Sequence, residues 1–356
     1  PVPAARVLPV LALRRPDMLR LLSLNLQHAL PGAGAADPAG SGSGADADRA
    51  NTADVANADI TDPEAARTVL AVLADQIAEL APDVVALQEV DKGQARSGYL
   101  DQAAVLAELL GWEHYRFAAT CAGPVAGLRR RPRRSALANS SDDVLGLGRA
   151  LLGRPPAGFG NALLSRHPVT AWRVQRLGRG PATLTRRVTD RPAWDPRGYE
   201  LATSTMRNLL TATLTLTDAA LTGVSTLSVG TTHLATRTDT ATGQLAAAWG
   251  ALATLPGPHL LAGDYNLRTE EVAPLGIGRQ VGDGPTFPAW GPDRRIDHVL
   301  TDPWPTGVNG APAFPVVGAP AWNGARHPLL QAASWGTRTF VVSDHAGTWV
   351  DLEPVG

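Results

Sequence analysis

Short runs of apolar residues, most of them ending in a glycine or a polar side chain, recur along the whole chain. Runs of this length between turn-forming residues are typical of buried β-strands. The predicted strands cover residues 18–24, 83–87, 159–166, 167–174, 206–216, 224–232, 259–263, 295–300 and 347–352. Threonine alternates with apolar residues along 206–216, so this strand is expected to pair with 224–232 as an antiparallel hairpin.

Apolar residues at helical spacing occupy three further segments. The first helix begins at Asp62, a capping carboxylate that Pro63 and Glu64 follow, and it ends before Pro82. Two more helices are predicted over residues 101–110 and 238–255. Strands and helices alternate irregularly, so the predicted α/β architecture has two mixed β-sheets packed face to face and flanked by helices.

Three long segments interrupt this pattern, and we expect them to be mobile insertions. They cover residues 31–60, 120–158 and 303–337, the last of which is rich in Pro, Gly and Trp and is expected to be a surface loop. The first is built mainly from small and polar residues, which bury too little apolar surface to offset their ordering entropy. No linker divides the chain, so one domain is predicted over residues 18–353, after an extension at residues 1–17.

Composition narrows the class of protein. The chain has 356 residues, of which 44% are hydrophobic, and its formal net charge of −1 gives no overall basic field for nucleic acid. The single cysteine, Cys121, excludes an internal disulfide, and no run approaches the ~20 apolar residues of a membrane span. These features predict a cytoplasmic protein. The alternative is that the apolar, proline-broken start is the remnant of a trimmed export or membrane segment.

Polar side chains stand at or beside the ends of most predicted strands. They are Asn25, Glu89, Asn161, His233, Asp264, Asn266, Asp297, Asp344 and His345. Residues two apart in a strand point to the same side, so Asp264 and Asn266 are expected to face one cleft while Tyr265 faces away. Taken singly, each residue could instead have a structural role, as a turn residue, a helix cap or a solvated strand end. Together they predict one shared rim that could hold a phosphate and a water molecule.

The same residues belong to short motifs with a characteristic order. The motifs are Asn25, Leu87-Gln88-Glu89, Gly160-Asn161-Ala162-Leu163-Leu164-Ser165, Thr232-His233-Leu234, Gly263-Asp264-Tyr265-Asn266, Arg295-Ile296-Asp297-His298 and Ser343-Asp344-His345. This order resembles the endonuclease/exonuclease/phosphatase superfamily, which includes pancreatic-type deoxyribonucleases, abasic-site endonucleases and neutral sphingomyelinases. The resemblance spans residues 18–353, and it implies a four-layered α/β sandwich and a phosphoesterase that depends on Mg²⁺ or Mn²⁺.

The resemblance also implies a metal site. Glu89 matches the principal metal ligand, Asp344 lies beside the metal, and Asn25 bridges the metal and the phosphate. Oxygen ligands suit a hard cation such as Mg²⁺. A metal at Glu89 would explain why an acid ends an otherwise apolar strand, because a buried carboxylate without a partner is costly.

Catalytic roles follow from the same resemblance. His345 matches the general base or the phosphate-facing histidine, and Asp297 matches the carboxylate that orients it. Asp264 would align or deprotonate the attacking water, with Asn266 on a phosphate oxygen. His233 would support the phosphate or protonate the leaving oxygen. Further substrate contacts are predicted at Asn161 and Arg207.

Three positions depart from the family pattern. Tyr265 replaces the common aromatic residue of its motif, and His298 stands where an aromatic residue often follows the motif aspartate. Ala241 occupies a position that commonly carries arginine, three residues before Gln244. None of these changes removes a catalytic group, but they separate the chain from any one characterised subfamily.

The substrate class stays open at this stage. A phosphodiesterase, with a nuclease as one form, is the first hypothesis. A lipid phosphodiesterase of sphingomyelinase type and a phosphomonoesterase acting on inositol or sugar phosphates are alternatives, and a non-catalytic phosphate-binding scaffold is a remote one. Five arginines near Pro132 favour a polyanion such as nucleic acid, whereas tryptophans in loops expected at the rim favour a membrane lipid. The arginines are Arg129, Arg130, Arg131, Arg133 and Arg134, and the tryptophans are Trp290, Trp304, Trp322 and Trp335. The sequence indicates no oligomeric state.

Overall fold

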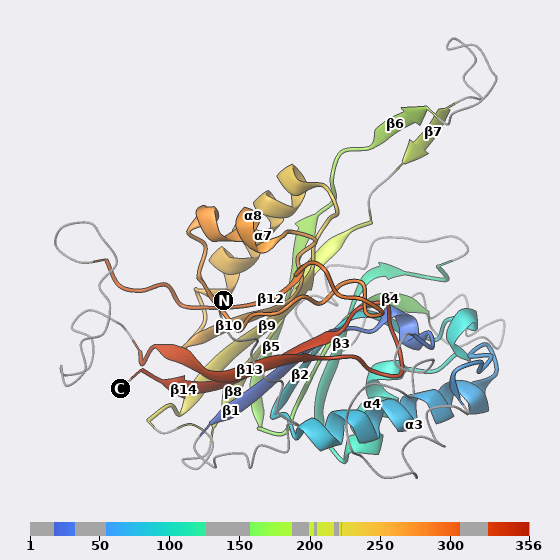
Figure 1. Ribbon diagram of the computed structural model, residues 1–356, viewed down its shortest axis with the longest axis horizontal. Helices are drawn as coiled ribbons and strands as arrows, with labels where there is room; N and C mark the ends of the chain where they lie inside the picture. Colours follow the sequence, from blue (N-terminus) through green and yellow to red (C-terminus); the bar gives the residue numbers. More distant parts are fainter. Residues whose placement is uncertain are drawn as a thin grey trace, which may run out of the picture.

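Two six-stranded β-sheets pack against each other in the computed structural model (Figure 1). The structure describes residues 18–32, 55–125, 157–186, 199–202, 205–216, 221, 223–306 and 327–355. The first sheet has the spatial order β13 (Leu330–Arg338), β14 (Gly347–Pro354), β1 (Leu19–Asn25), β2 (Val84–Lys92), β4 (Gly158–Ser165) and β3 (His114–Ala122). The second has the order β11 (Arg279–Val281), β12 (Asp297–Thr301), β10 (His259–Asp264), β9 (Thr226–His233), β8 (Arg207–Thr215) and β5 (Val169–Gly178).

Both sheets are mixed. In the first, β1 and β2 run parallel, and in the second, β9 and β10 run parallel, while the remaining pairs are antiparallel. The hairpin predicted from the alternating threonines is confirmed as the antiparallel pair of β8 and β9. A separate hairpin of β6 (Thr183–Arg186) and β7 (Tyr199–Ala202) projects from the body of the molecule (Figure 1).

Helices cover the outer face of each sheet, which produces four layers. The helices α3 (Pro63–Leu80) and α4 (Gln102–Leu110) lie on the first sheet, and α7 (Thr238–Leu252) and the short α8 (Thr269–Val272) lie beside the second (Figure 1). As predicted, Asp62 caps α3, because its carboxylate accepts hydrogen bonds from the backbone N–H groups of Glu64 and Ala65. The predicted two-sheet α/β sandwich is therefore confirmed.

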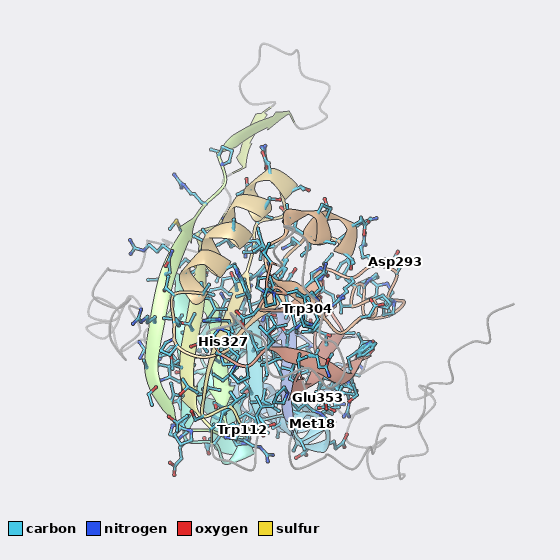
Figure 2. All side chains as sticks on the ribbon, turned by 90° about the vertical axis from the view of Figure 1, so that its left-hand side faces the viewer. Met18, Trp112, Asp293, Trp304, His327 and Glu353 are labelled. Atoms are coloured by element: carbon cyan, nitrogen blue, oxygen red, sulfur yellow. The ribbon has the colours of Figure 1, made fainter. Side chains whose placement is uncertain are left out.

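The strands are apolar on both faces because each sheet lies between two cores. Leu21 belongs to the core between the sheets, while its neighbour Leu22 packs under the helices of the first sheet. Leu260 and Leu261 divide in the same way between the inter-sheet core and the core beneath α7. Successive residues of a strand face opposite sides, so continuous apolar runs are required here, and side chains fill the space between the layers (Figure 2).

Parts of the predicted insertions belong to the fold. The loop predicted over 303–337 is wrong at its end, because Leu330–Arg338 forms β13, an edge strand whose weak apolar pattern reflects pairing with β14 alone. The insertion predicted over 31–60 ends too late, because Val55 and Ile60 are buried in the helix-side core. The insertion predicted over residues 120–158 overlaps both β3 and β4. The sequence pattern did not predict β3. The remainder of these segments and the extension at 1–17 lie outside the described residues.

Within the described part of the chain, no helix combines the length and the apolar character needed to cross a membrane.

Candidate active site

Strand direction brings the predicted site residues to one end of the sandwich. Asn25 ends β1, His233 ends β9 and Asp264 ends β10. Antiparallel partners contribute from their opposite termini, since Asp297 begins β12 beside Asp264, and Arg207 begins β8. Residues from both sheets and from most of the chain length therefore meet at one rim.

Glu89 reaches this rim through an irregularity in β2. The pairing of β2 with β4 shifts register between Leu87 and Val90, and Glu89 has a φ of +53°. A bulge that forces a non-glycine residue into the left-handed region re-aims its side chain, and such strain is concentrated at functional sites. Burial raises the pKa of the Glu89 carboxyl, Asp344 adds to the rise, and the nearby cations Arg207 and His345 oppose it.

Asn25 links the two sheets at the rim. Its Nδ2 donates to Oδ2 of Asp264 over 3.0 Å, while its Oδ1 accepts the backbone N–H of Gln27 over 3.1 Å. It also lowers the pKa of the Glu89 carboxyl. One end of the amide therefore fixes a turn, and the other faces the Asp264 carboxylate.

His345 and Asp297 form a buried pair. Nδ1 of His345 lies 2.9 Å from Oδ2 of Asp297, which fixes the ring so that Nε2 points to the rim. That Nε2 lies 3.9 Å from Oδ2 of Asp264 and 4.0 Å from Oδ1 of Asp344. Burial alone would lower the pKa of His345, but the charge and hydrogen bond of Asp297 and the charges of Asp264 and Asp344 raise it to about 9.

Asp264 is the most central carboxylate. Burial, followed by repulsion from Asp297, raises its pKa to about 7, whereas His345, the Asn266 backbone N–H and Asn25 lower it. The rise has a simple cause, since two carboxylates on adjacent strands cannot both ionise freely in a buried site. A carboxyl with this pKa can accept a proton near neutral pH.

His233 and Arg207 complete the cluster. Nε2 of His233 lies 3.3 Å from Oδ2 of Asp264, and its Nδ1 lies 3.7 Å from Oε1 of Glu89. Burial and the charges of Arg207 and His345 hold the pKa of His233 well below its usual value, so this imidazole is neutral. Arg207 is attracted to Asp264 and Glu89, and its buried Nε has no hydrogen-bond partner among the described residues.

Two predicted contact residues are engaged elsewhere in the protein. Asn266 lies just beyond β10 with a φ of +51°, where its backbone N–H donates to Asp264 Oδ1 and its Nδ2 donates to the Leu234 carbonyl. Asn161 donates from Nδ2 to Oδ1 of Asn208 over 2.8 Å, which ties β4 to β8. These bonds favour positioning roles for both amides. Tyr265 faces away from the rim, as predicted, into the core beneath α7.

The donor set fits a hard divalent cation. Glu89 and Asp344 offer carboxylate oxygens, and mutual repulsion between these two acids would be relieved by a positive charge. The Asn25 amide turns Nδ2, not Oδ1, toward Asp264, because Oδ1 accepts the backbone N–H of Gln27. Asp264, Asp297 and His345 also bring ligand atoms within 4.8 Å of one another, and Oδ1 of Asp297 is buried without a hydrogen bond among the described residues. The residues present therefore fit a divalent metal ion, and the predicted choice of Mg²⁺ or Mn²⁺ stays a prediction.

Other residues around the site were not predicted. Phe287 packs on His345 with ring centroids 4.8 Å apart, and the Gln27 side chain accepts the backbone N–H of Asp344. Asn208 supports Asn161 and itself donates to backbone carbonyls of β3. For Asn208, the one available sequence signal was its position directly after Arg207 at the start of a strand. The position of Phe287 depends on the path of a loop, which the local sequence pattern does not define.

The tryptophan prediction needs correction. Trp304 follows β12 at the end away from Asp297 and packs on Arg279, and Trp335 lies within β13. Trp290 is the one placed near the site, because the N–H of the preceding Ala289 donates to the Asp344 carbonyl and the side chain is 70% exposed. The fourth tryptophan and the arginine cluster at 129–134 lie outside the described residues.

Comparison with known proteins agrees with this architecture. The family model described as "Endonuclease/Exonuclease/phosphatase family" matches residues 22–345. No curated protein matches the sequence. A family structure from Bacteroides thetaiotaomicron is 14% identical, with a TM-score of 0.52, and the match covers 94% of this chain and 95% of that one. A structure from Bacteroides vulgatus is 13% identical, with a TM-score of 0.52, and the match covers 95% of this chain and 100% of that one. A structure from Beutenbergia cavernae is 22% identical, with a TM-score of 0.49, and the match covers 96% of this chain and 72% of that one.

Because the family model spans most of the sequence, the chain belongs to the endonuclease/exonuclease/phosphatase family.

Proposed function

We propose that this protein is a divalent-metal-dependent phosphodiesterase in which water attacks the phosphate ester. The observation that carries the proposal is the convergence of Asp264 Oδ2 with Nε2 of His345, Nε2 of His233 and Nδ2 of Asn25 at one rim. Members of the family are generally metal-dependent phosphoester hydrolases. A rim with a carboxylate acceptor, neutral donors and buried cations has the groups that this reaction needs.

The pKa values favour one division of acid and base roles. Asp264, with a pKa of about 7, takes the proton of the attacking water as the new P–O bond forms and the P–O bond to the departing ester oxygen breaks. His345, with a pKa of about 9, is an imidazolium at neutral pH and donates from Nε2 to a phosphate oxygen. This division favours the phosphate-facing role of His345 over that of general base. Asp297 keeps the ring oriented and charged.

Glu89 and Asp344 are the residues that would hold the cation. When bound, the cation supplies positive charge to the phosphate and to the departing oxygen. Arg207 adds a fixed positive charge beside the same carboxylates, and neutral His233 donates a hydrogen bond without adding a charge that repels the cation. The repulsion that a phosphate anion would meet from Asp264 and Glu89 is offset in this way.

A phosphomonoesterase is the second candidate. Two cationic side chains, Arg207 and His345, lie at the rim in addition to the proposed metal. This amount of positive charge suits a dianionic monoester as well as a monoanionic diester. The aryl substrates bis(p-nitrophenyl) phosphate and p-nitrophenyl phosphate distinguish the two.

The direct test compares those two substrates with Mg²⁺ or Mn²⁺ and with EDTA. The proposal predicts that the diester is hydrolysed faster, that EDTA abolishes turnover, and that His345→Ala and Glu89→Ala each lose most of it. Faster hydrolysis of the monoester would select the second candidate. Full rates in both variants would show that the chemistry lies elsewhere, and no turnover of any ester would favour a phosphate-binding scaffold.

The natural substrate requires a panel of plasmid DNA, RNA, sphingomyelin vesicles and inositol phosphates. Trp290 is an exposed aromatic beside the site, and such a side chain stacks on nucleic-acid bases or inserts at a lipid interface. We expect Trp290→Ala to raise KM for the natural substrate without changing kcat. Trp335→Ala is the matched control, because this tryptophan is 49% exposed but lies within β13. Equal effects of the two variants would remove Trp290 from the substrate site.

A further inference from the structure

A second cluster of metal-binding side chains lies at the other end of the strands that carry the active site. His259 begins β10 and Asp302 follows β12, whereas Asp264 and Asp297 lie at the opposite termini of this antiparallel pair. The backbone distance from His259 to Asp264 along β10 is roughly 16 Å at strand rise. The two clusters therefore cannot share one ion.

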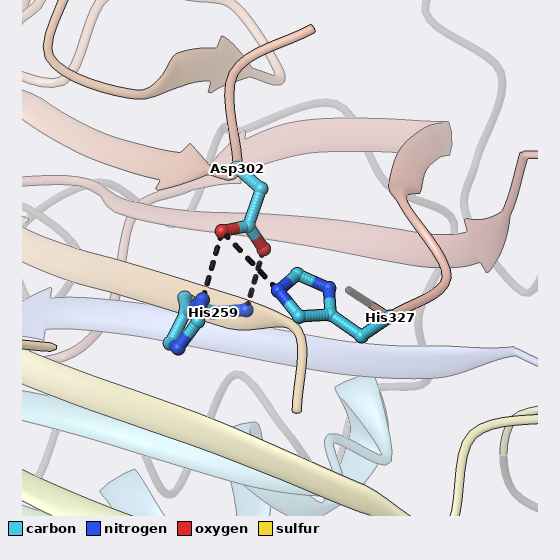
Figure 3. A group of neighbouring side chains, drawn as sticks. All are labelled: His259, Asp302 and His327. Atoms are coloured by element: carbon cyan, nitrogen blue, oxygen red, sulfur yellow. Dashed lines mark hydrogen bonds and ion pairs between the residues drawn. The ribbon is translucent and has the colours of Figure 1, made fainter. Parts of the chain in front are cut away.

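Three ligand atoms converge in this second cluster (Figure 3). Nδ1 of His259 lies 2.8 Å from Oδ1 of Asp302, and Nε2 of His327 lies 3.9 Å from the same oxygen. All three ligand atoms lie within 4.8 Å of one another. The other carboxylate oxygen of Asp302 accepts the backbone N–H of His259 over 2.8 Å, which fixes the orientation of the carboxylate.

Hydrogen bonds to backbone carbonyls orient both imidazoles. Nε2 of His259 donates to the Leu255 carbonyl over 2.9 Å, and Nδ1 of His327 donates to the Pro328 carbonyl over 3.2 Å. Without a metal, Nδ1 of His259 donates to Oδ1 of Asp302. Burial alone would lower the pKa of this histidine, but this hydrogen bond and the charge of Asp302 raise it. A bound metal would replace that proton, and the ring nitrogens opposite the two carbonyl contacts would then present lone pairs to it. A histidine that binds a metal commonly donates its second N–H to a carbonyl in this way.

We propose that His259, Asp302 and His327 bind a transition-metal dication of the zinc class, separate from the catalytic cation. Bonds of ~2.0 Å in a tetrahedral site place ligand atoms roughly 3.3 Å apart. The measured separations of 2.8 and 3.9 Å bracket that value. Imidazole nitrogens favour Zn²⁺ over Mg²⁺, and three protein ligands leave the fourth position to water.

Such an ion would join the two sheets. His327 leads into β13 of the first sheet, while His259 begins β10 and Asp302 directly follows β12, both in the second sheet. We therefore assign it a stabilising role at the end of the sandwich. Arg279 is also attracted to Asp302, so this site is expected to bind Zn²⁺ less tightly than one without a neighbouring cation. The competing explanation is a metal-free ion pair of His259 and Asp302.

The test measures zinc content and thermal unfolding in a background with a weakened catalytic site. Glu89→Gln protein is dialysed against Zn²⁺ with excess Mg²⁺, and bound zinc is measured by elemental analysis. The proposal predicts about one Zn²⁺ per chain, loss of that zinc in Glu89→Gln/His327→Ala, and a Zn²⁺-dependent rise in Tm only when His327 is present. His167→Ala in the same background is the matched control, because His167 faces a different carboxylate, Asp83, at 3.4 Å.

Cobalt provides a second measurement that does not depend on the His327 variant. Co²⁺ bound to the Glu89→Gln protein should give the visible absorption of a four-coordinate nitrogen and oxygen site, and added Zn²⁺ should remove it. Absence of bound Zn²⁺ in the Glu89→Gln protein, or equal zinc content with and without His327, would overturn the proposal in favour of the ion pair. Neither readout depends on phosphoesterase activity, so failure of the proposed function leaves this test intact.

Discussion

His345 and Asp297 are 48 positions apart in sequence, yet Nδ1 of one lies 2.9 Å from Oδ2 of the other. Asp297 begins β12 directly opposite Asp264 on β10. This antiparallel register therefore places the two carboxylates side by side. His345, which precedes β14, offsets their negative charge. The unequal pKa values of Asp264 and His345 follow from this arrangement.

Replacement of Asp297 tests the orientation of His345. Asp297→Asn preserves the size of the side chain but removes the charge that favours the imidazolium, so kcat should fall by ~10²–10⁴-fold with little change in KM. Steady-state kinetics on the aryl phosphodiester measures both parameters. Asp283→Asn removes an exposed carboxylate from the segment before β12 and should behave as wild type. A wild-type kcat in Asp297→Asn would refute the orienting role.

Replacement of Glu89 tests the metal site. Glu89→Gln keeps the shape but removes the charge, so the Mg²⁺ concentration that gives half-maximal activity should rise by at least about tenfold. A Mg²⁺ titration of the hydrolysis rate provides this value. Glu108→Gln, which removes an exposed acid paired with Arg67, is the control. If both variants require the same Mg²⁺ concentration, Glu89 is not a ligand.

The pH dependence of kcat/KM tests the division of proton roles. The rate should rise as Asp264 loses its proton near its pKa of about 7 and fall as His345 loses its proton near its pKa of about 9. This order gives a bell-shaped profile of the free enzyme. The measurement is initial rate against pH at subsaturating substrate. A profile that increases steadily through both values would show that His345 acts without its proton.

Stability should depend on His298, where the family pattern commonly has an aromatic residue. Its ring stacks on Tyr265, and burial, with help from Arg295, lowers its pKa to about 4. The folded state therefore binds fewer protons, so the stability contribution is complete above the unfolded pKa and is lost as pH falls towards 4. The loss amounts to about 3 kcal/mol.

Denaturant unfolding of His298→Phe at several pH values measures this effect. The variant loses two hydrogen bonds and is expected to be less stable at neutral pH, but its stability should change less on acidification. His28, whose pKa is also lowered to about 4, leaves a residual slope of the same sign. An unchanged slope in His298→Phe would contradict the neutral, buried state of this histidine.

The pattern of apolar and polar residues was sufficient to predict the strands that are buried on both faces and the helices that are buried on one face. The runs that became β1, β2 and β10 could be recognised because both faces are buried, and α3 could be recognised by its cap. β13 escaped prediction because an edge strand buries little, and its residues alternate between half-buried and exposed positions. Val55 and Ile60 escaped because two apolar residues in a polar segment give no periodicity.

The site could be predicted as a list of residues but not as a set of contacts. Ordered motifs identified the residues at the rim, yet they could not indicate that Asn266 donates to Leu234 or that Asn161 donates to Asn208. Those bonds depend on the bend after β10 and on the distance between the sheets. The cluster of His259, Asp302 and His327 left no motif, because strand register places only His259 beside Asp302, and His327 reaches them from the segment before β13.

The most direct measurement is the anomalous scattering of Mn²⁺ in crystals grown with inorganic phosphate. The account predicts a peak within bonding distance of the Glu89 carboxylate and a phosphate within hydrogen-bond distance of His345 and Asn25. A Mn²⁺ ion bound away from Glu89, or a phosphate that reaches neither His345 nor Asn25, would contradict this prediction.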